Sequence, residues 1–156
     1  MPSVVSNRIM PCLCFDGTGE EAAKFYTSVF PNSRIGHIMR WGEGGHASAG
    51  TALTVEFELD GAKFVALNGG PQFRFTEAVS FQVFCKDQAE VDYYWDRLSE
   101  GGETSVCSWL KDRFGLSWQI VPAVLPRLLA DPARAGRVMA ALMGMKKLDI
   151  RALEAA

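Results

Sequence analysis

The chain has 156 residues, of which 48% are hydrophobic and 22% are charged, and its formal net charge at pH 7 is −2. This length and composition suit one compact soluble domain, so we expect residues 1–156 to form a single domain. The absence of dense Lys/Arg runs argues against a nucleic-acid partner, because such binding depends on many phosphate contacts. We expect a cytoplasmic protein that does not contact membranes, since the N-terminal residues lack a signal-peptide pattern and no apolar run is long enough to span a bilayer.

Strand and helix patterns alternate in the first half of the chain. The apolar run 8–15 predicts a strand, and a helix is expected from about Gly19 to Phe30. Three further strands are expected at 33–41, 51–59 and 62–68, with a glycine-rich loop between the first two and a hairpin turn between the last two. This first module spans about 8–70 and has the order strand, helix, strand, strand, strand.

The second half repeats this order in a second module, at about 76–122. We expect a strand at 78–85, a helix at 88–99, and strands at 103–110 and 116–121, so that any third strand here must be short. A helical extension, 123–156, follows. Three helical patterns occur in this extension. The first covers 124–130, the second begins with Asp131 as N-cap and Pro132 as first helical residue, and the third covers 150–153.

The two module helices carry the same signature, sixty-nine residues apart. Thr18 and Asp87 are predicted N-caps, and Glu21 and Glu90 lie three positions after them, where each side chain can reach back to the cap. Each helix continues with an apolar i, i+3, i+4, i+7 stripe. The repetition indicates an internal duplication, which favours a binding pocket within or between the duplicated modules.

The four cysteines are expected to be reduced, because Cys12 and Cys14 are too close along one strand for an ordinary disulfide. Cys107 is the best candidate for a nucleophile, although no histidine lies near it in the sequence to activate a thiolate. An inert, partly buried thiol is the competing interpretation of Cys107. His46 lies in a glycine-rich loop and is expected to be exposed to solvent, or to belong to a lid.

The doubled strand-helix-strand-strand-strand order resembles the vicinal oxygen chelate superfamily of glyoxalases, bleomycin-resistance proteins and extradiol dioxygenases. Local sequence resembles the PhnB-like family, which often carries the label demethylubiquinone methyltransferase-like. The resemblance covers essentially the whole chain, and the run that ends in Trp118-Gln119-Ile120-Val121-Pro122 is a specific match. It implies an α+β fold in which two paired βαβββ modules form a curved mixed sheet, followed by C-terminal helices. It also implies a small-molecule ligand, and we expect a homodimer.

Members of this superfamily hold one metal ion through side chains of the first and last strand of each module, usually His or Glu. The resemblance places three of these positions at Pro11, Ser80 and Gln119 and leaves the fourth open between Val65 and Asn68. None of these is a usual ligand. Moreover, no Asp, Glu, His or Cys occurs between positions 61 and 71 or between 114 and 130. We therefore expect no metal ion and no other cofactor.

Strand alternation from Pro11 and Ser80 then predicts which side chains line the cup of the sheet. Cys12 and Cys14 are predicted to face the first helix, and Gln119 to bring Ser117 and Val121 to the cup side. Such a cup suits a small, partly aromatic, uncharged or weakly polar ligand. The predicted ligand-binding residues are Leu13, Phe15, Ser80, Gln82, Phe84 and Gln119.

Two functions follow from these patterns. The first is metal-free binding of a small molecule. The alternative is an enzyme, either a metal-dependent one of the glyoxalase or dioxygenase type or one that uses Cys107 or Gln119 directly. The methyltransferase label has no counterpart in the residues, because the chain lacks the glycine-rich strand-to-helix turn of a parallel sheet that S-adenosylmethionine enzymes use.

Overall fold

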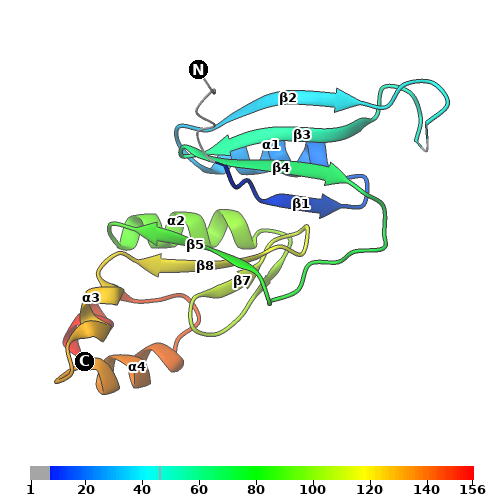
Figure 1. Ribbon diagram of the computed structural model, residues 1–156. Helices are drawn as coiled ribbons and strands as arrows, with labels where there is room; N and C mark the ends of the chain where they lie inside the picture. The colour runs from blue at the N-terminus through cyan, green and yellow to red at the C-terminus, as the bar shows by residue number, and fades with distance from the viewer. Residues whose placement is uncertain (1–7, 46) are drawn as a thin grey trace. The chain divides into compact units, whose positions relative to one another are not determined.

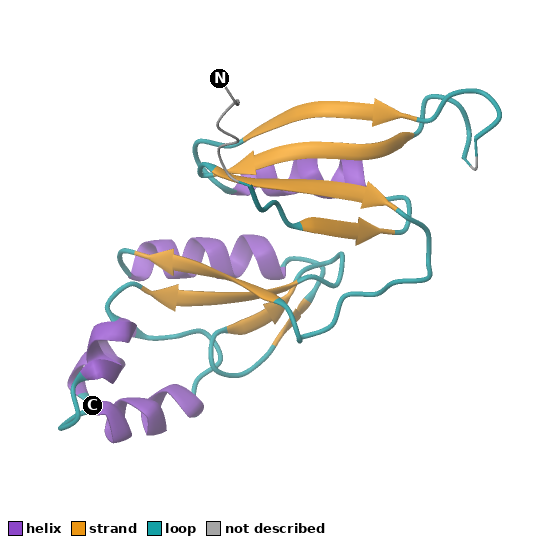
Figure 2. Ribbon diagram, in the orientation of Figure 1, coloured by secondary structure: helices purple, strands orange, loops and turns teal. Residues whose placement is uncertain are grey.

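The structure is a computed structural model that describes residues 8–45 and 47–156. His46 lies outside the described residues. The chain divides into two compact units, one ending at Arg74 and the other beginning at Phe75. Each unit has a helix packed on a four-stranded mixed sheet, and further helices follow the second sheet (Figures 1 and 2), which confirms the predicted α+β class. No helix among the described residues is long and apolar enough to cross a membrane.

The first unit contains one helix and four strands, in the predicted order. The sheet order is β1-β4-β3-β2, in which β1 and β4 run parallel and the other neighbours run antiparallel. The elements are β1 (Cys12–Phe15), α1 (Gly19–Val29), β2 (Arg34–Arg40), β3 (Ala52–Leu59) and β4 (Ala62–Asn68).

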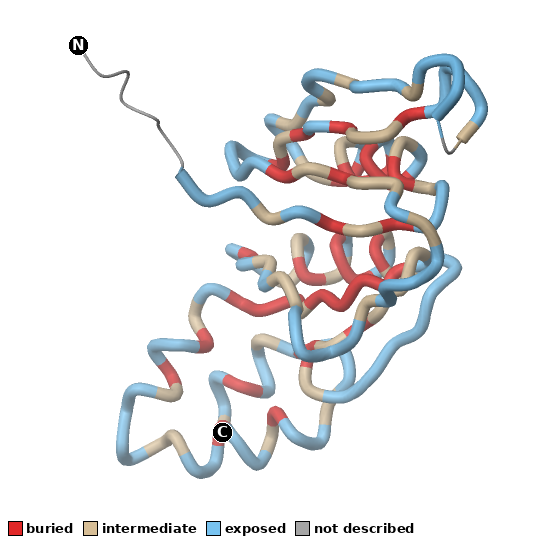
Figure 3. Tube along the Cα trace, turned by 45° about the vertical axis from the view of Figure 1, so that its right-hand side comes forward, coloured by how far each residue is buried: buried red, intermediate tan, exposed pale blue. Residues whose placement is uncertain are grey.

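The apolar stripe of α1 packs on one face of this sheet. Tyr26 is fully buried, and its ring stacks on that of Phe57 on β3, with 6.1 Å between centroids and 30° between the ring planes. Val55 and Ala66 are directly opposite each other on β3 and β4, and both are buried on the same face. The other face is more exposed, as the alternation of buried and exposed positions along β3 and β4 shows (Figure 3).

The beginning of α1 is capped differently from the prediction. Thr18 is the N-cap residue, as predicted, and its carbonyl accepts from the Ala22 N–H at 2.8 Å, but its side chain makes no capping hydrogen bond. Instead, the Gly19 N–H donates to Asn68 Oδ1 at 2.8 Å, and the Asn68 amide donates to the Ala52 carbonyl at 2.9 Å. A Cβ on Gly19 would lie 2.8 Å from Asn68 Oδ1, so glycine permits this long-range cap.

The second unit repeats the arrangement with shorter strands. Its sheet order is β5-β8-β7-β6, with β5 and β8 parallel. The predicted Asp87 cap is confirmed, because its side chain accepts a hydrogen bond from the Glu90 N–H, while the Glu90 carboxylate accepts from the Lys86 N–H. The elements are β5 (Ser80–Cys85), α2 (Gln88–Ser99), β6 (Glu103–Thr104), β7 (Trp109–Lys111) and β8 (Ser117–Pro122).

The segment predicted as one strand, 103–110, is two strands. The chain reverses between β6 and β7, so that Glu103 pairs with Lys111 and Thr104 with Leu110. At the reversal, Cys107 and Ser108 have φ angles of +58° and +77°. Positive φ at two successive non-glycine residues is incompatible with a continuous strand. The prediction of one strand was wrong because neither residue is typical of such a turn.

The C-terminal extension forms three short helices, α3 (Leu125–Ala130), α4 (Ala135–Met143) and α5 (Ile150–Ala155). They enclose an apolar cluster of their own, and Val121 at the end of β8 belongs to it. This cluster attaches the helices to the second sheet. Its buried members are Val121, Leu125, Leu128, Val138, Leu142, Leu148 and Leu153.

Helix α4 begins later than predicted. Asp131 ends α3, and its carboxylate accepts a hydrogen bond from the Ala133 N–H in a local turn. The Asp131 carbonyl accepts from the N–H groups of Arg134 and Ala135. The predicted helix start at Pro132 is three residues too early, because α4 begins at Ala135 with Arg134 in the N-cap position. The hydrogen bonds to Asp131 are nevertheless those of a capping residue, and they close the turn that leads into α4.

Candidate functional site

The structure corrects the predicted face of β1. Leu13 and Phe15 are buried, with 6% and 3% of their surfaces exposed, and Leu13 is paired with Ala66 on the face covered by α1. Their predicted position in the open cup is therefore wrong. Alternation itself holds, but its phase is shifted by one residue, because Pro11 precedes the strand instead of lying within it.

The same shift moves two thiols to the open face of the first sheet. Cys12 is exposed and Cys14 half-buried, whereas both were predicted to face α1. Partial burial raises the pKa of the Cys12 thiol, and the neighbouring Cys14 raises it by a smaller amount. Cys85 is fully buried, and burial above all, with smaller contributions from Glu90 and Asp87, raises its pKa to about 12. Accessibility to a reagent therefore differs strongly between these cysteines.

We expect Ellman's reagent, at mildly alkaline pH, to modify Cys12 in the native protein and to leave Cys85 unmodified. Cys12→Ser should remove one rapidly reacting thiol, and Cys85→Ser should remove none. After unfolding in guanidinium, all four thiols of the wild type should react. Loss of a rapidly reacting thiol in Cys85→Ser would contradict the burial described here.

In the second unit, the predicted polar side chains meet on the face opposite α2. Gln119 Nε2 donates to Ser80 Oγ at 2.8 Å, and Gln82 Nε2 donates to Gln119 Oε1 at 3.5 Å. Phe84 follows Gln82 on the same face of β5 and is 56% exposed. The predicted common face of Ser80, Gln82, Phe84 and Gln119 is confirmed, whereas Val121 is buried among the C-terminal helices.

The open face continues onto β7 and β6, which the sequence prediction did not include. Trp109 is directly opposite Gln119, and Lys111 is directly opposite Ser117. Opposite residues of paired strands place their side chains on the same face. No sequence pattern predicts these neighbours, because the reversal before β7 sets the register.

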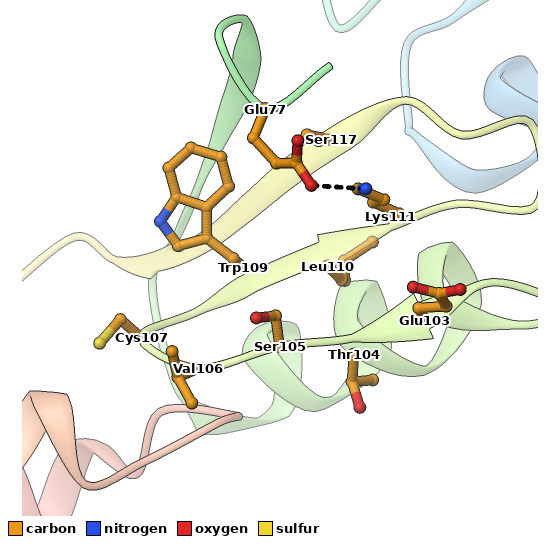
Figure 4. A pocket seen from close by; sticks show the side chains of 10 residues that line it. All are labelled: Glu77, Glu103, Thr104, Ser105, Val106, Cys107, Trp109, Leu110, Lys111 and Ser117. Atoms are coloured by element: carbon orange, nitrogen blue, oxygen red, sulfur yellow. Dashed lines mark ion pairs between the residues drawn. The ribbon is translucent and has the colours of Figure 1, made fainter. Parts of the chain in front are cut away.

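A cavity of about 440 Å³ lies on this part of the second unit. Val106, Cys107, Trp109 and Leu110 contribute carbon and sulfur to its lining, so the structure places the predicted nucleophile candidate Cys107 at its wall (Figure 4). Polar side chains line the remainder, and these are Glu77, Glu103, Thr104, Ser105, Lys111 and Ser117.

An ion pair lies within this cavity. Lys111 Nζ is 2.5 Å from Glu77 Oε1, and Figure 4 shows Glu77 reaching toward Lys111 from the segment that precedes β5. The contact with Lys111 lowers the pKa of the Glu77 carboxyl, and the same contact raises the pKa of Lys111. Both groups are thus charged at neutral pH.

Ser117, beside this ion pair, is fully buried. Within residues 8–45 and 47–156, its Oγ is the buried side-chain nitrogen or oxygen atom that has no hydrogen-bond partner. Buried hydroxyls are normally hydrogen-bonded, so this one requires a physical explanation. It lines the cavity, where a bound molecule can supply the missing partner.

The C-terminal extension fixes the wall of the cavity. The Cys107 N–H donates to the Met145 carbonyl at 2.8 Å, and the Ser108 N–H donates to the Lys146 carbonyl at 3.0 Å. Left-handed backbone at non-glycine residues costs about 1–3 kcal/mol each and persists only where surrounding contacts impose it. These two hydrogen bonds are such contacts. The shape of the cavity therefore depends on residues beyond the second sheet.

Comparison with known proteins identifies the family. Residues 7–121 match the model of the family described as 3-demethylubiquinone-9 3-methyltransferase. The chain belongs to this family. It is 34% identical to the PhnB protein of Bacillus cereus, with a TM-score of 0.69 over 74% of this chain and 99% of that one. A search of curated protein sequences gave no match.

More distant structures share the fold alone. Protein PA1353 of Pseudomonas aeruginosa is 18% identical, with a TM-score of 0.62 over 75% of this chain and 98% of that one. The fosfomycin resistance protein FosX of Mesorhizobium loti is 14% identical, with a TM-score of 0.55 over 84% of this chain and all of that one. A glyoxylase/bleomycin resistance protein/dioxygenase domain from Frankia is 13% identical, with a TM-score of 0.52 over 76% of this chain and 92% of that one, which confirms the predicted type of fold.

The methyltransferase description of the family does not fit a site for S-adenosylmethionine in this chain. Both four-stranded sheets are mixed, whereas that cofactor is bound at a glycine-rich turn of a parallel sheet. The turn before α1 contains Gly17 and Gly19, but the Gly19 N–H already donates to Asn68. In the described part of the chain, this turn therefore has no resemblance to the cofactor-binding turn beyond its two glycines.

The residues do not fit the metal site of the superfamily either. Ser80 and Gln119 offer a hydroxyl and a neutral amide, and they are hydrogen-bonded to each other. Metal ions of the glyoxalase type are held by imidazole and carboxylate groups. In residues 8–45 and 47–156, no group of three or more His, Cys, Asp and Glu side chains is arranged to hold an ion. We therefore derive no chemical step from a metal.

Proposed function

We propose that this protein binds a small organic molecule on the open face of the second sheet, without a metal ion. The observation that supports this proposal best is the hydrogen-bonded row Ser80, Gln119 and Gln82 beside a cavity of about 440 Å³. Ligand cavities of proteins commonly have volumes of about 300–1,000 Å³ and combine apolar walls with a few well-placed polar groups. This face has both properties.

The row is suited to orienting a ligand. Gln119 donates through its amide nitrogen to Ser80 at 2.8 Å, and this bond favours one orientation of the amide before a ligand arrives, while Gln82 approaches the amide oxygen at 3.5 Å. Preorganised polar groups lose less conformational entropy on binding. Trp109, opposite Gln119, adds an aromatic surface on which a planar ring can stack. A partly aromatic ligand with polar substituents uses all of these features.

The first test of the proposal is elemental analysis of the full chain. We expect less than about a tenth of an equivalent of Zn²⁺, Mn²⁺, Fe²⁺ or Ni²⁺ per chain after incubation with each ion and removal of excess, because Ser80, Gln82 and Gln119 offer only neutral donors. Close to one equivalent per chain would overturn the metal-free proposal and favour a metal-dependent enzyme.

Binding is tested with 2-naphthamide, a neutral aromatic probe, added to protein treated with EDTA. Gln119→Leu should weaken its binding about fivefold or more, because a ligand-orienting hydrogen bond contributes about 1 kcal/mol. Isothermal titration calorimetry measures the change. Gln72→Leu in the first unit is a matched control that should leave affinity unchanged. Equal affinity of wild type and Gln119→Leu would contradict the proposed role of the row.

Three further predictions belong to this proposal: a single domain over 1–156, a homodimer and a cytoplasmic location. Light scattering after size-exclusion chromatography measures the oligomeric state directly. A mass of one chain at micromolar concentration would contradict the homodimer.

A further inference from the structure

The hydroxyl of Ser117 indicates where the ligand of this cavity is held. Its Oγ is buried and has no hydrogen-bond partner among the described residues, although it lines the cavity. Leaving a buried hydroxyl unsatisfied is unfavourable, so natural proteins rarely keep one without a ligand or water to satisfy it. A bound group that reaches Ser117 removes this cost.

Lys111 is a charged residue next to Ser117 in the sheet. It is directly opposite Ser117 in the register of β7 and β8, and its ammonium is paired with the Glu77 carboxylate. Glu77 lies outside the strands, and its side chain is 60% exposed. Exposed ion pairs contribute little to stability, so Glu77 can be exchanged for another anion at small cost.

The arrangement resembles an occupied carboxylate site in which a side chain of the protein takes the position of the ligand. Lys111 belongs to β7 and is held in the sheet, whereas Glu77 belongs to an irregular segment. Glu77 can therefore move away without breaking strand pairing. Its carboxylate, Lys111 and Ser117 line the same cavity (Figure 4).

We infer that the ligand is an aromatic acid whose carboxylate replaces Glu77 on Lys111 and accepts a hydrogen bond from the Ser117 hydroxyl. This inference rests on the proposed function and specifies its ligand class. The aromatic body lies against Trp109 and Val106, which line the same cavity. The expected ligand is thus more strongly polar than the uncharged one predicted from the sequence, because Lys111 was not predicted to lie on this face.

The charge balance of the cavity decides between an acid and an amine. Glu103 is opposite Lys111 on β6 and also lines the cavity, so two carboxylates surround one ammonium. When Glu77 leaves, Lys111 and Glu103 balance each other, and the carboxylate of the ligand restores the original charge. An amine would instead have to displace Lys111 from Glu77, or bind Glu103 close to the Lys111 ammonium, where like charges repel. The two ligand classes therefore respond in opposite directions to removal of the Glu77 charge.

The test uses the full chain at pH 7 and three probes of one shape: 2-naphthoate, 2-naphthamide and 2-naphthylmethylamine. Relative to wild type, Glu77→Gln should bind 2-naphthoate about fivefold more tightly, because the competing anion is gone. Lys111→Met should bind it about tenfold more weakly, because a charge-assisted hydrogen bond is lost. Neither change should alter the affinity for 2-naphthamide by more than about twofold, since this probe has no charge.

Two controls separate binding from folding. Lys147 forms an ion pair with Asp92, and its side chain is 39% exposed, compared with 37% for Lys111. Lys147→Met therefore removes a similar lysine ion pair outside the cavity and should leave the affinity for 2-naphthoate unchanged. Ser117→Ala removes a hydroxyl that has no partner in the described structure, so its thermal midpoint should equal or exceed that of the wild type. Its affinity for 2-naphthoate should nevertheless fall about threefold to fivefold.

Each result distinguishes this inference from the proposed function. If 2-naphthamide binds and depends on Gln119 while 2-naphthoate is indifferent to Glu77→Gln and Lys111→Met, the ligand class is wrong and the binding function stands. The inference is also overturned if 2-naphthoate fails to bind at millimolar concentration, or if Glu77→Gln weakens 2-naphthylmethylamine while leaving 2-naphthoate unchanged. A bound metal ion with no response to any probe overturns the proposed function itself.

Discussion

Asp112→Asn is expected to lower the free energy of unfolding of the second unit by about 3 kcal/mol. Asp112 is 2% exposed, and its carboxylate accepts three hydrogen bonds. Oδ1 accepts from the N–H groups of Phe114 and Leu116 at 2.8 and 3.1 Å, and Oδ2 accepts from the indole N–H of Trp118 at 2.8 Å. Asparagine keeps the shape of the side chain, but its NH₂ group must face one of these donors, which is then left buried without an acceptor.

Guanidinium unfolding followed by tryptophan fluorescence measures this loss. Trp95, Trp109 and Trp118 lie in the second unit and only Trp41 in the first, so the signal reports chiefly on the affected unit. Asp131→Asn is a matched control, since the Asp131 side chain accepts from the Ala133 N–H in an exposed turn, and it should cost less than about 1 kcal/mol. A change below about 0.5 kcal/mol in Asp112→Asn would contradict the importance of the three bonds.

Local patterns in the sequence predicted the elements well where one signal determined the outcome. The helix 88–99 was predicted with both ends, because the Asp87 cap and the following glycines mark them. The open face of β5 and β8 was also predicted, because the family resemblance placed Ser80 and Gln119 on the cup side and alternation holds along these six-residue strands. In β1 the same alternation predicted the wrong face, because Leu13 and Phe15 are buried instead of open. That strand has four residues, and Pro11 before it supplied the phase.

Interactions between segments far apart in the chain were the part that the sequence did not predict. The Asn68 side chain accepts a hydrogen bond from the first residue of α1, Gly19, whereas the Thr18 side chain makes no capping bond. No residue pattern near Thr18 predicts this long-range bond. Likewise, Glu77 and Lys111 form a pair only because the reversal before β7 brings Lys111 opposite Ser117. Register of this kind depends on tertiary packing, to which strand propensity is insensitive.

The helical extension shows why family membership alone does not describe the candidate site. The family model ends at residue 121, and the Bacillus cereus relative covers 74% of this chain. Yet the carbonyls of Met145 and Lys146, beyond that limit, accept the hydrogen bonds that hold Cys107 and Ser108 in their left-handed conformation. A cavity wall of this protein thus depends on a segment that lies outside the family model.

Gly102→Ala is expected to destabilise the second unit by about 3 kcal/mol, because the new methyl group would meet rigid backbone. A Cβ at Gly102 would lie 2.1 Å from the Lys111 carbonyl oxygen and 2.7 Å from the Asp112 carbonyl carbon. Neither atom can move easily: Lys111 is paired with both β6 and β8, and the Asp112 side chain is anchored by its three hydrogen bonds. The clash must therefore shift β6 or the turn after β7.

The same guanidinium experiment measures the effect of Gly102→Ala, with Gly136→Ala in α4 as its control. A Cβ at Gly136 would have no atom within 4 Å, so this change should be neutral or stabilise by up to about 1 kcal/mol through helix propensity. A loss of stability below about 1 kcal/mol in Gly102→Ala would contradict the close approach of the Lys111 and Asp112 backbone to Gly102.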